Sequence, residues 1–329
     1  SLFRHLLSLL LALPCFTSGA EAPLAQEAPV YPSLTLSNGP VSALLYLPDA
    51  EHGYYRGPRF SWGGMVGRLT WGDRQVFAQW TAEHDPLTHD HGIGTAGEFG
   101  MMSPLGYDEA AVGDSFIKIG VGWLERFEDK PYGFMKAYKV QKAAPWTVTK
   151  GDNWAEFTQE LADPRGYGYV LKQRFELLPE STTLQVTYDL KNTGDRLIVT
   201  EHYSHNFVVL DDEPIGANYL LSVPFTFKPK ANRSGLHELR GEHELTFAAE
   251  WPAGAAFFAP LLGIKGQRSE NFMKLLNQKT GTSLTLSGDW APVKFHLFAT
   301  AKAVCPEPIL NLDLQPGASR QWVTRYALA

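Results

Sequence analysis

The sequence predicts an all-β protein built as a large antiparallel sandwich. Many short runs alternate apolar and polar residues with a period of two, these runs are rich in β-branched and aromatic residues, and Gly, Pro, Asn or Asp fill the gaps between them. The 329 residues are 44% hydrophobic and 12% aromatic, which is enough for a substantial core. No fixed-period repeat indicates a propeller or solenoid, and no shift in composition marks a domain boundary.

The alternation predicts a series of strands and one short helix. The helix is expected over residues 269–276. The strands are expected over residues 41–47, 67–71, 75–80, 115–127, 154–161, 167–178, 183–190, 197–210, 219–227, 244–248, 283–286, 293–300 and 321–328.

The first 20 residues have the pattern of a secretory signal. Arg4 precedes an apolar stretch at 6–13 that is too short to span a membrane comfortably, and small residues at 18–20 resemble a cleavage site. We therefore expect an exported protein, periplasmic or extracellular, with no integral membrane segment once the signal is removed. Residues 21–33 predict a flexible lead-in, and 34–329 a single β-sandwich domain.

Charge and cysteine content exclude several classes of protein. The whole chain has 29 basic and 35 acidic residues, and loss of Arg4 with the signal leaves a net charge of about −7. This acidic balance does not favour binding to nucleic acid or to an anionic membrane. Only Cys305 remains in the mature chain, so no internal disulfide is possible and stability must come from the core.

The stretch 200–212 places an unusual set of polar residues within an apolar run. The preceding run, 184–190, and the turn residues at 191–194 predict that this strand pairs with its predecessor. Because side chains alternate along a strand, His202 and His205 cannot share a face without a bulge. The expected faces are Glu201, Tyr203, His205 and Phe207 on one side, and His202, Ser204, Asn206 and Val208 on the other.

A second candidate group is Glu307, near the C-terminus. Pro306 and Pro308 flank it, which fixes the backbone and aims the carboxylate as a general base requires. His205 and Glu307, on different strands in apolar settings, can form an acid–base pair that needs no metal. The alternatives are a core histidine bonded to backbone at 205 and a turn residue facing water at 307.

Two segments rich in functional groups, 53–64 and 84–109, are expected to be loops on the β scaffold. Arginine forks suit vicinal hydroxyls or carboxylates, and Tyr132, Trp62 and Trp123 either stack on a pyranose or pack in the core. The histidine and aspartate spacing at 84–91 matches no metal motif, so we predict neither a metal nor a cofactor. The predicted substrate-binding residues are Arg56, Arg59, His89, Glu98, Arg126, Tyr132 and Asn206.

Short motifs resemble a known superfamily. Residues 204–207 (Ser-His-Asn-Phe) resemble the Asn-His-x-Tyr/Phe strand motif of the galactose mutarotase (aldose 1-epimerase) superfamily, and 304–308 is similar to its C-terminal Cys-x-Glu segment. Residues 55–60, 98–99, 105–109 and 119–122 are similar to a group of exported bacterial mutarotase-like proteins. The chain departs from the epimerase pattern at Ser204 and lacks a Gly-Arg-x-x-Asn-Arg segment, which argues against an ordinary free hexose as substrate.

The resemblance implies a β-supersandwich that holds a carbohydrate, either a monosaccharide or a glycan end, in a cleft. It implies that His205 acts as general acid on the ring oxygen and that Glu307 takes the anomeric hydroxyl proton, with His202 as the second choice of acid. The expected activity is therefore that of an aldose 1-epimerase-like isomerase. The alternatives are a lyase acting on acidic glycans, for which the arginines would neutralise a uronate, and a non-catalytic glycan-binding module.

Overall fold

Strand β12 (Thr183–Asn192) lies near the centre of the largest sheet of the chain. The computed structural model describes residues 30–227 and 235–329, and Tyr31–Ala329 form one unit. Within these residues the large sheet has ten antiparallel strands. Their order is β15 (His237–Leu239), β16 (Glu244–Phe247), β14 (Tyr219–Ser222), β18 (Phe272–Asn277), β19 (Ser283–Gly288), β22 (Ser319–Leu328), β12, β11 (Gly168–Leu177), β10 (Trp154–Ala162) and β9 (Trp146–Lys150).

Three smaller antiparallel sheets complete the described strands. The five-stranded sheet has the order β17 (Ala256–Pro260), β20 (Lys294–Thr300), β21 (Val304–Leu314), β13 (Ile198–Phe207) and β5 (Gly94–Phe99). The four-stranded sheet is β1 (Ser33–Ser37), β2 (Val41–Tyr46), β3 (Met65–Trp71) and β4 (Arg74–Val76), and the three-stranded sheet is β6 (Ser115–Lys118), β7 (Gly122–Glu125) and β8 (Val140–Ala143). One 3-10 helix, Arg268–Glu270, precedes β18.

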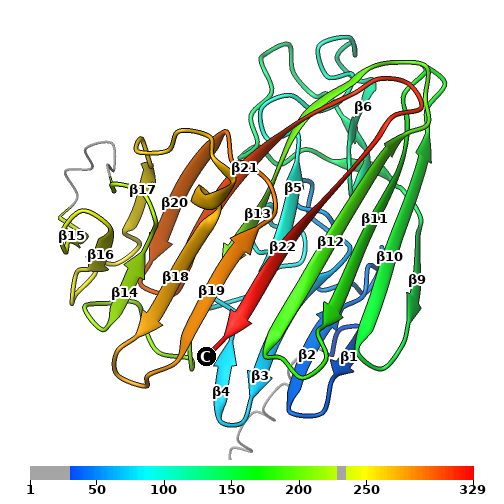
Figure 1. Cartoon of the computed structure of the whole chain (residues 1–329). Coiled ribbons are helices and arrows are strands. Elements are labelled where there is room, and N and C mark those ends of the chain that lie inside the picture. Colours follow the sequence, from blue (N-terminus) through cyan, green and yellow to red (C-terminus); the bar gives the residue numbers. More distant parts are fainter. Residues whose placement is uncertain (1–29, 228–234) are drawn as a thin grey trace, which may run out of the picture. The chain divides into compact units, whose positions relative to one another are not determined.

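The ten-stranded sheet packs face to face against the five-stranded sheet, and the strands of both sheets can be followed by their labels in Figure 1. The Tyr188 hydroxyl of β12 lies 3.1 Å from the Ser204 hydroxyl of β13, and the Tyr326 hydroxyl of β22 donates to the Asn206 side chain at 2.8 Å. Apolar side chains of both inner faces fill the rest of this layer. The predicted antiparallel sandwich is therefore confirmed.

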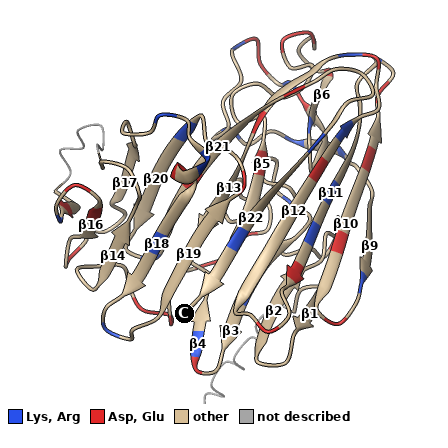
Figure 2. Cartoon of the chain, viewed as in Figure 1, with Lys and Arg blue, Asp and Glu red and all other residues tan. Residues whose placement is uncertain are grey.

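The other face of the ten-stranded sheet carries charge. Figure 2 shows basic and acidic positions on neighbouring strands of β10, β11 and β12. Lys172 pairs in register with Asp189 and lies 3.7 Å from Glu156, and both of these acids are half-buried. Opposite charges on neighbouring strands are typical of a solvent-facing sheet surface. This leaves the five-stranded sheet as the scaffold for the polar cluster at 200–212.

Most predicted strands are present, but the expected loop at 84–109 contains strand β5, and three further expectations were wrong. The segment 269–276 is not a helix, because burial of Met273 and Leu275 in the sheet follows a period of two and overrides helix propensity. Residues 115–127 form a hairpin, β6 and β7, and not one strand. Gly120 has a φ of +86°, and a Cβ there would lie 2.6 Å from the Ser61 side chain, so the turn requires glycine.

The third error concerns the partner of β13. We expected it to pair with β12, but β12 is occupied on both edges by β11 and β22, and β13 pairs with β21 and β5. The buried amide of Asn192 donates to the carbonyls of Arg196 and Leu314 at 2.7 and 2.8 Å, so it fixes the corner between the two sheets. The strand with both histidines thus lies across the sandwich from its predecessor.

Among the described residues, no helix is long and apolar enough to cross a membrane. The predicted signal at 1–20 and most of the lead-in lie outside the described residues, and β1 already begins at Ser33. Cys305 is buried within β21 as a free thiol.

Candidate active site

His205 and Glu307 meet on the five-stranded sheet. Val208 and Val304 exchange both backbone hydrogen bonds at 2.9 Å, and counting back along β13 and forward along β21 places His205 opposite Glu307. In an antiparallel ladder, the pairs that do not exchange backbone hydrogen bonds bring their side chains closest together. His205 and Glu307, three positions from the hydrogen-bonded pair Val208 and Val304, form such a pair. His205 Nε2 lies 3.1 Å from Glu307 Oε1, and both side chains are buried. The structure therefore brings together the two residues that the sequence singled out.

The prolines on either side of Glu307 alter the ladder between β13 and β21. Pro306 and Pro308 have no N–H, so they donate nothing to β13. The Asn206 side chain instead donates to the carbonyls of Ser204 and Pro306, at 3.0 and 2.7 Å. An amide side chain thus replaces missing backbone donors directly behind the His205–Glu307 pair, which holds the two strands in register there.

The pair lies at a cavity of about 460 Å³. This volume falls within the range of roughly 300–1,000 Å³ typical of small-ligand sites. Polar lining residues come from loops and from the five-stranded sheet, and apolar ones supply the remaining half. The lining residues are Arg59, His89, Asp90, Met101, Met102, Phe134, Met135, His205, Phe258, His296, Phe298 and Glu307.

Burial sets the protonation of the pair. It raises the pKa of Glu307 to about 8; Arg59 opposes this rise, and Glu98 and Asp90 reinforce it. Burial also lowers the pKa of His205 well below 6.5, and the Arg59 cation adds to the effect. Near neutral pH the two groups therefore share one proton, which resides on Glu307.

The imidazole of His205 is held by ring packing. Its ring stacks on Phe207, with centroids 4.2 Å apart, and meets Phe60 and Phe298 edge-on at 5.6 and 5.7 Å. Among the described residues its Nδ1 has no hydrogen-bond partner. Either neutral tautomer of the ring therefore loses no hydrogen bond at Nδ1, and Nε2 is the nitrogen that contacts Glu307.

Arg59 is the central cation of the cavity wall. Its Nε donates to Glu98 at 2.8 Å, its Nη1 to Asp90 at 2.6 Å and its Nη2 to the Tyr203 hydroxyl at 2.9 Å. Burial would lower the pKa of Arg59, but the surrounding anionic groups hold it well above its ordinary value. Each nitrogen of the Arg59 guanidinium thus has one partner, and Arg59 is a fixed cation.

A buried ion pair lies behind Arg59. Lys118 Nζ donates to Glu98 Oε1 at 2.8 Å and to the Gly100 carbonyl at 3.0 Å, and the Tyr203 hydroxyl donates to the other oxygen of Glu98. Burial would raise the pKa of Glu98, but Lys118 and Arg59 outweigh it and hold this pKa below its ordinary value. The two cations Lys118 and Arg59 are therefore balanced by the carboxylates of Glu98 and Asp90.

His202 lies on the opposite face of β13 from the cavity. Its Nδ1 accepts a hydrogen bond from Trp322 Nε1 at 3.2 Å, and the rings of Tyr188 and Phe99 pack against it at 4.6 and 4.4 Å. Burial lowers its pKa to about 3. It is a neutral core histidine, and the structure does not bring it to Glu307; Asn206 shares its face.

Of the other predicted binding residues, Arg59 and His89 line the cavity, and Glu98 acts on it through Arg59. Arg126 Nη1 instead donates to the Ala110 carbonyl at 2.5 Å, and Tyr132 stacks on Tyr138 with centroids 5.0 Å apart. Arg56 is not among the cavity-lining residues.

The two candidate tryptophans and the histidine loop serve structural roles. The indole N–H of Trp62 donates to the Gly57 carbonyl, and that of Trp123 donates to Asp163. His84 stacks on Tyr54 at 3.8 Å, and His91 Nδ1 accepts the Asp85 N–H. In the described part of the chain no group of three or more His, Cys, Asp or Glu side chains could hold a metal ion.

Sequence reasoning missed much of the cavity wall. Asp90, His296 and the methionines were not predicted to bind ligand. His296 can be recognised as a site residue only from the tertiary structure, where β20 pairs it directly with Glu307. Lys118 was missed because a fully buried lysine looks, in sequence, like any polar strand residue.

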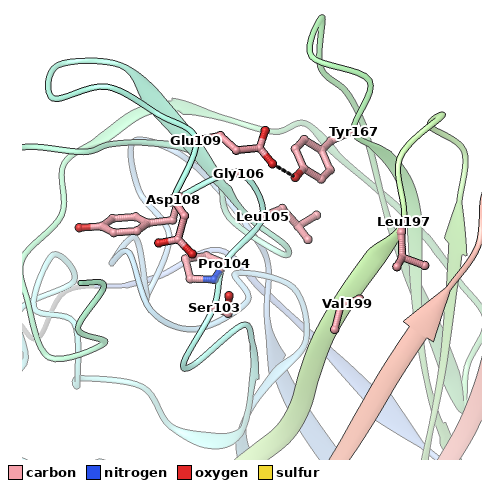
Figure 3. A pocket seen from close by; sticks show the side chains of 10 residues that line it. Ser103, Pro104, Leu105, Gly106, Asp108, Glu109, Tyr167, Leu197 and Val199 are labelled. Carbon is pink, nitrogen blue, oxygen red and sulfur yellow. Dashed lines mark hydrogen bonds between the residues drawn. The ribbon is translucent and has the colours of Figure 1, made fainter. Parts of the chain in front are cut away.

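A second, smaller hollow of about 180 Å³ lies beside β13 near residues 103–109. Figure 3 shows Asp108 and Glu109 at its wall, with the Tyr167 hydroxyl donating to Glu109 at 3.0 Å. Glu109 also forms an exposed ion pair with Arg196. Both carboxylates at this hollow are exposed, and Glu109 is already paired, so neither resembles the buried Glu307 of the larger cavity.

No protein-family model matches the chain, and no curated protein matches its sequence. Solved structures do match it. The GalM/aldose epimerase homologue from Caenorhabditis elegans aligns over 91% of this chain and 99% of its own, with a TM-score of 0.54 at 11% identity. The chain adopts the galactose mutarotase-like fold.

Two further structures support this mutarotase-like fold. The galactose mutarotase related enzyme from Lactobacillus acidophilus matches 90% of this chain and 97% of its own, with a TM-score of 0.52 at 12% identity. The Slr1438 protein from Synechocystis matches 93% and 98%, with a TM-score of 0.55 at 12% identity. The predicted superfamily resemblance is therefore confirmed at the level of fold, and in this mutarotase-like chain the His205–Glu307 cavity is built on the five-stranded sheet.

Proposed function

We propose that this protein binds a carbohydrate and interconverts the two anomers of a reducing sugar, with His205 and Glu307 as the proton-transferring pair. The observation that carries the proposal is the 3.1 Å contact between these side chains at a cavity of small-ligand size. The mutarotase-like fold supports the proposal at the level of protein class.

The side-by-side geometry suits a hemiacetal. The ring oxygen and the anomeric hydroxyl of a sugar are bonded to the same carbon, so an acid and a base that serve them must lie next to each other. His205 and Glu307 contact each other directly, and a sugar would replace this contact with its own two oxygens. Each group would then lie within hydrogen-bond reach of one oxygen.

The reaction needs one proton on the pair and consumes none. We assign the protonation of the ring oxygen to His205 and the removal of the anomeric hydroxyl proton to Glu307. The C1–ring oxygen bond breaks as the carbonyl forms, the C1–C2 bond rotates, and reclosure returns both protons. Before the sugar displaces the direct contact, the resting proton is transferred across it from Glu307 to His205; the pKa order of the two groups makes this transfer uphill, and it gives the required imidazolium and carboxylate.

The electrostatics favour a neutral sugar. A lyase acting on uronates would require an available arginine, but Arg59, the arginine that lines the cavity, is already paired with Glu98 and Asp90. Above about pH 8, where Glu307 ionises, a ligand carboxylate would also be repelled by the negative charge of Glu307. We therefore expect neutral aldoses to be better substrates than uronic acids.

The test is polarimetry or NMR of freshly dissolved α-aldoses and uronic acids with the wild-type protein. We expect faster equilibration of the anomers, and a loss of roughly 10²–10⁴-fold in kcat/KM in His205→Asn and in Glu307→Gln, as is typical when a general acid or base is removed. His202→Asn is a control, since His202 lies on the other face of β13.

Failure to accelerate any monosaccharide would refute the epimerase proposal. Binding of the same sugars without acceleration would then identify a glycan-binding module. Loss of activity in a normally folded His202→Asn variant would show that the assignment of the acid to His205 is wrong.

A further inference from the structure

Half of the cavity wall is apolar and is displayed at the protein surface. Met101 and Met102 follow β5, Phe134 and Met135 lie between β7 and β8, and Phe258 and Phe298 come from β17 and β20. The side chains of Met102 and Met135 are 65% and 69% exposed. Three of the five methionines in the chain line this one cavity.

The backbone that carries these side chains is anchored. The Met102 N–H donates to the Glu201 carboxylate at 2.6 Å, and the Gly100 N–H donates to the Glu201 carbonyl at 3.0 Å. Gly100 also accepts a bond from buried Lys118. Contacts with Glu201 and Lys118 thus fix the backbone at residues 100–102, and the exposed Met102 side chain lies at the cavity.

The second apolar loop is anchored in a similar way. Phe134 covers the Arg59 guanidinium at 4.6 Å, and the Gly133 N–H next to it donates to the Tyr138 hydroxyl at 3.2 Å. Met135 follows Phe134 directly. Exposed apolar side chains on a fixed backbone contribute little to the core, and when they cluster they indicate a binding surface.

The chemistry of this surface differs from that of a plain sugar site. Sugars stack on flat aromatic faces, whereas methionine offers a flexible, unbranched chain that fits irregular apolar groups. Two exposed methionines beside Phe134 and Phe258 therefore favour a ligand with an apolar portion. The polar groups that would bind hydroxyls, His205, Glu307 and Asp90, line the same cavity.

We propose that the ligand is an amphiphilic saccharide whose hemiacetal carbon lies at His205 and Glu307 and whose alkyl or acyl chain, attached away from that carbon, packs against Met102, Phe134, Met135 and Phe258. This inference rests on the proposed function for the placement of the hemiacetal. The alkyl or acyl chain of the ligand is inferred from the apolar wall alone.

The test compares 6-O-octanoyl and 6-O-acetyl derivatives of D-glucose and D-galactose, with calorimetry for binding and NMR for anomer exchange. Each buried methylene is worth roughly fourfold in affinity, so burial of three of the six additional methylenes predicts about 50-fold tighter binding of the octanoyl sugar. The double variant Met102→Ser/Met135→Ser should bring this ratio close to one, and Met102→Leu/Met135→Leu should restore most of it. Leu262→Ser is the matched control, because Leu262 is 60% exposed and does not line the cavity.

The outcomes separate the two proposals. Chain-dependent binding without anomer exchange would support the amphiphilic ligand and refute the epimerase. Exchange of both sugars with no dependence on chain length would overturn the amphiphilic ligand and retain the epimerase. A concentration-dependent dimer in the wild type that is lost in the Met102→Ser/Met135→Ser variant would also overturn it, since a second copy would then be the occupant of the apolar wall.

Discussion

Replacing Glu307 by glutamine should separate stability from activity at a single position. The glutamine keeps the shape of the side chain and a donor for His205, but it cannot ionise. In the wild type, burial holds the Glu307 carboxyl in its neutral form and raises its pKa from 4.5 to about 8. The variant therefore preserves the resting contacts and removes one titration.

The size of the pH effect on the free energy of unfolding follows from the linkage between proton binding and folding. Because the pKa of Glu307 is higher in the folded than in the unfolded protein, its contribution to stability is complete below pH 4.5 and is lost as the pH rises through 8. The full difference between these two pKa values corresponds to about 5 kcal/mol. Between pH 5 and pH 9 the wild type should lose about 4 kcal/mol relative to Glu307→Gln, of which only about 1 kcal/mol is lost between pH 7 and pH 9.

The assay is urea unfolding of both proteins at pH 5, 7 and 9. The difference between their free energies of unfolding isolates this carboxyl, because all other titrating groups are common to both. The variant should become progressively more stable than the wild type as the pH rises, while catalytic activity is lost at every pH. A difference that stays constant across this range would show that Glu307 titrates normally, and the single-proton pair would then be wrong.

Three further predictions follow from the same geometry, and a fourth follows from the sequence alone. The pH profile of kcat/KM should be flat near neutrality, fall above about pH 8 as Glu307 loses the shared proton, and fall in acid well below pH 6.5 as His205 gains one; a profile that rises through pH 8 would contradict the pair. Lys118→Met should lower the free energy of unfolding by about 3–5 kcal/mol, because it removes one cation from the buried network around Glu98; equal stability by urea unfolding would show that Arg59 alone suffices. Asn206→Ala should lower the free energy of unfolding by about 2–4 kcal/mol, because the carbonyls of Ser204 and Pro306 lose their donor, and it should also reduce kcat. Unchanged values for both would show that β13 and β21 stay paired without the amide. In a bacterial host the full chain should be exported and cleaved near residue 20, as checked by cell fractionation and N-terminal sequencing; an uncleaved product in the cytoplasm would exclude the signal.

Several features of the site were visible in local sequence. Alternation along 201–208 separated the face of His205 from that of His202, because side-chain direction in a strand depends only on position. The prolines around Glu307 indicated a fixed backbone, and the glycines and polar residues between apolar runs indicated an antiparallel β protein. These signals arise from interactions within a few residues, so the sequence contains them directly.

The partners of these residues were decided by tertiary structure. Nothing local shows that β13 crosses to the second sheet, because this depends on β22, more than 100 residues away, occupying the free edge of β12. The roles of Arg59 and Lys118 likewise require Glu98 to lie between them on β5, a strand that two glycines concealed. The sequence therefore determined which groups carry the chemistry, whereas long-range strand pairing determined their burial, their pKa values and the apolar wall beside them. Burial and pKa depend on neighbours that come together only when distant strands pack.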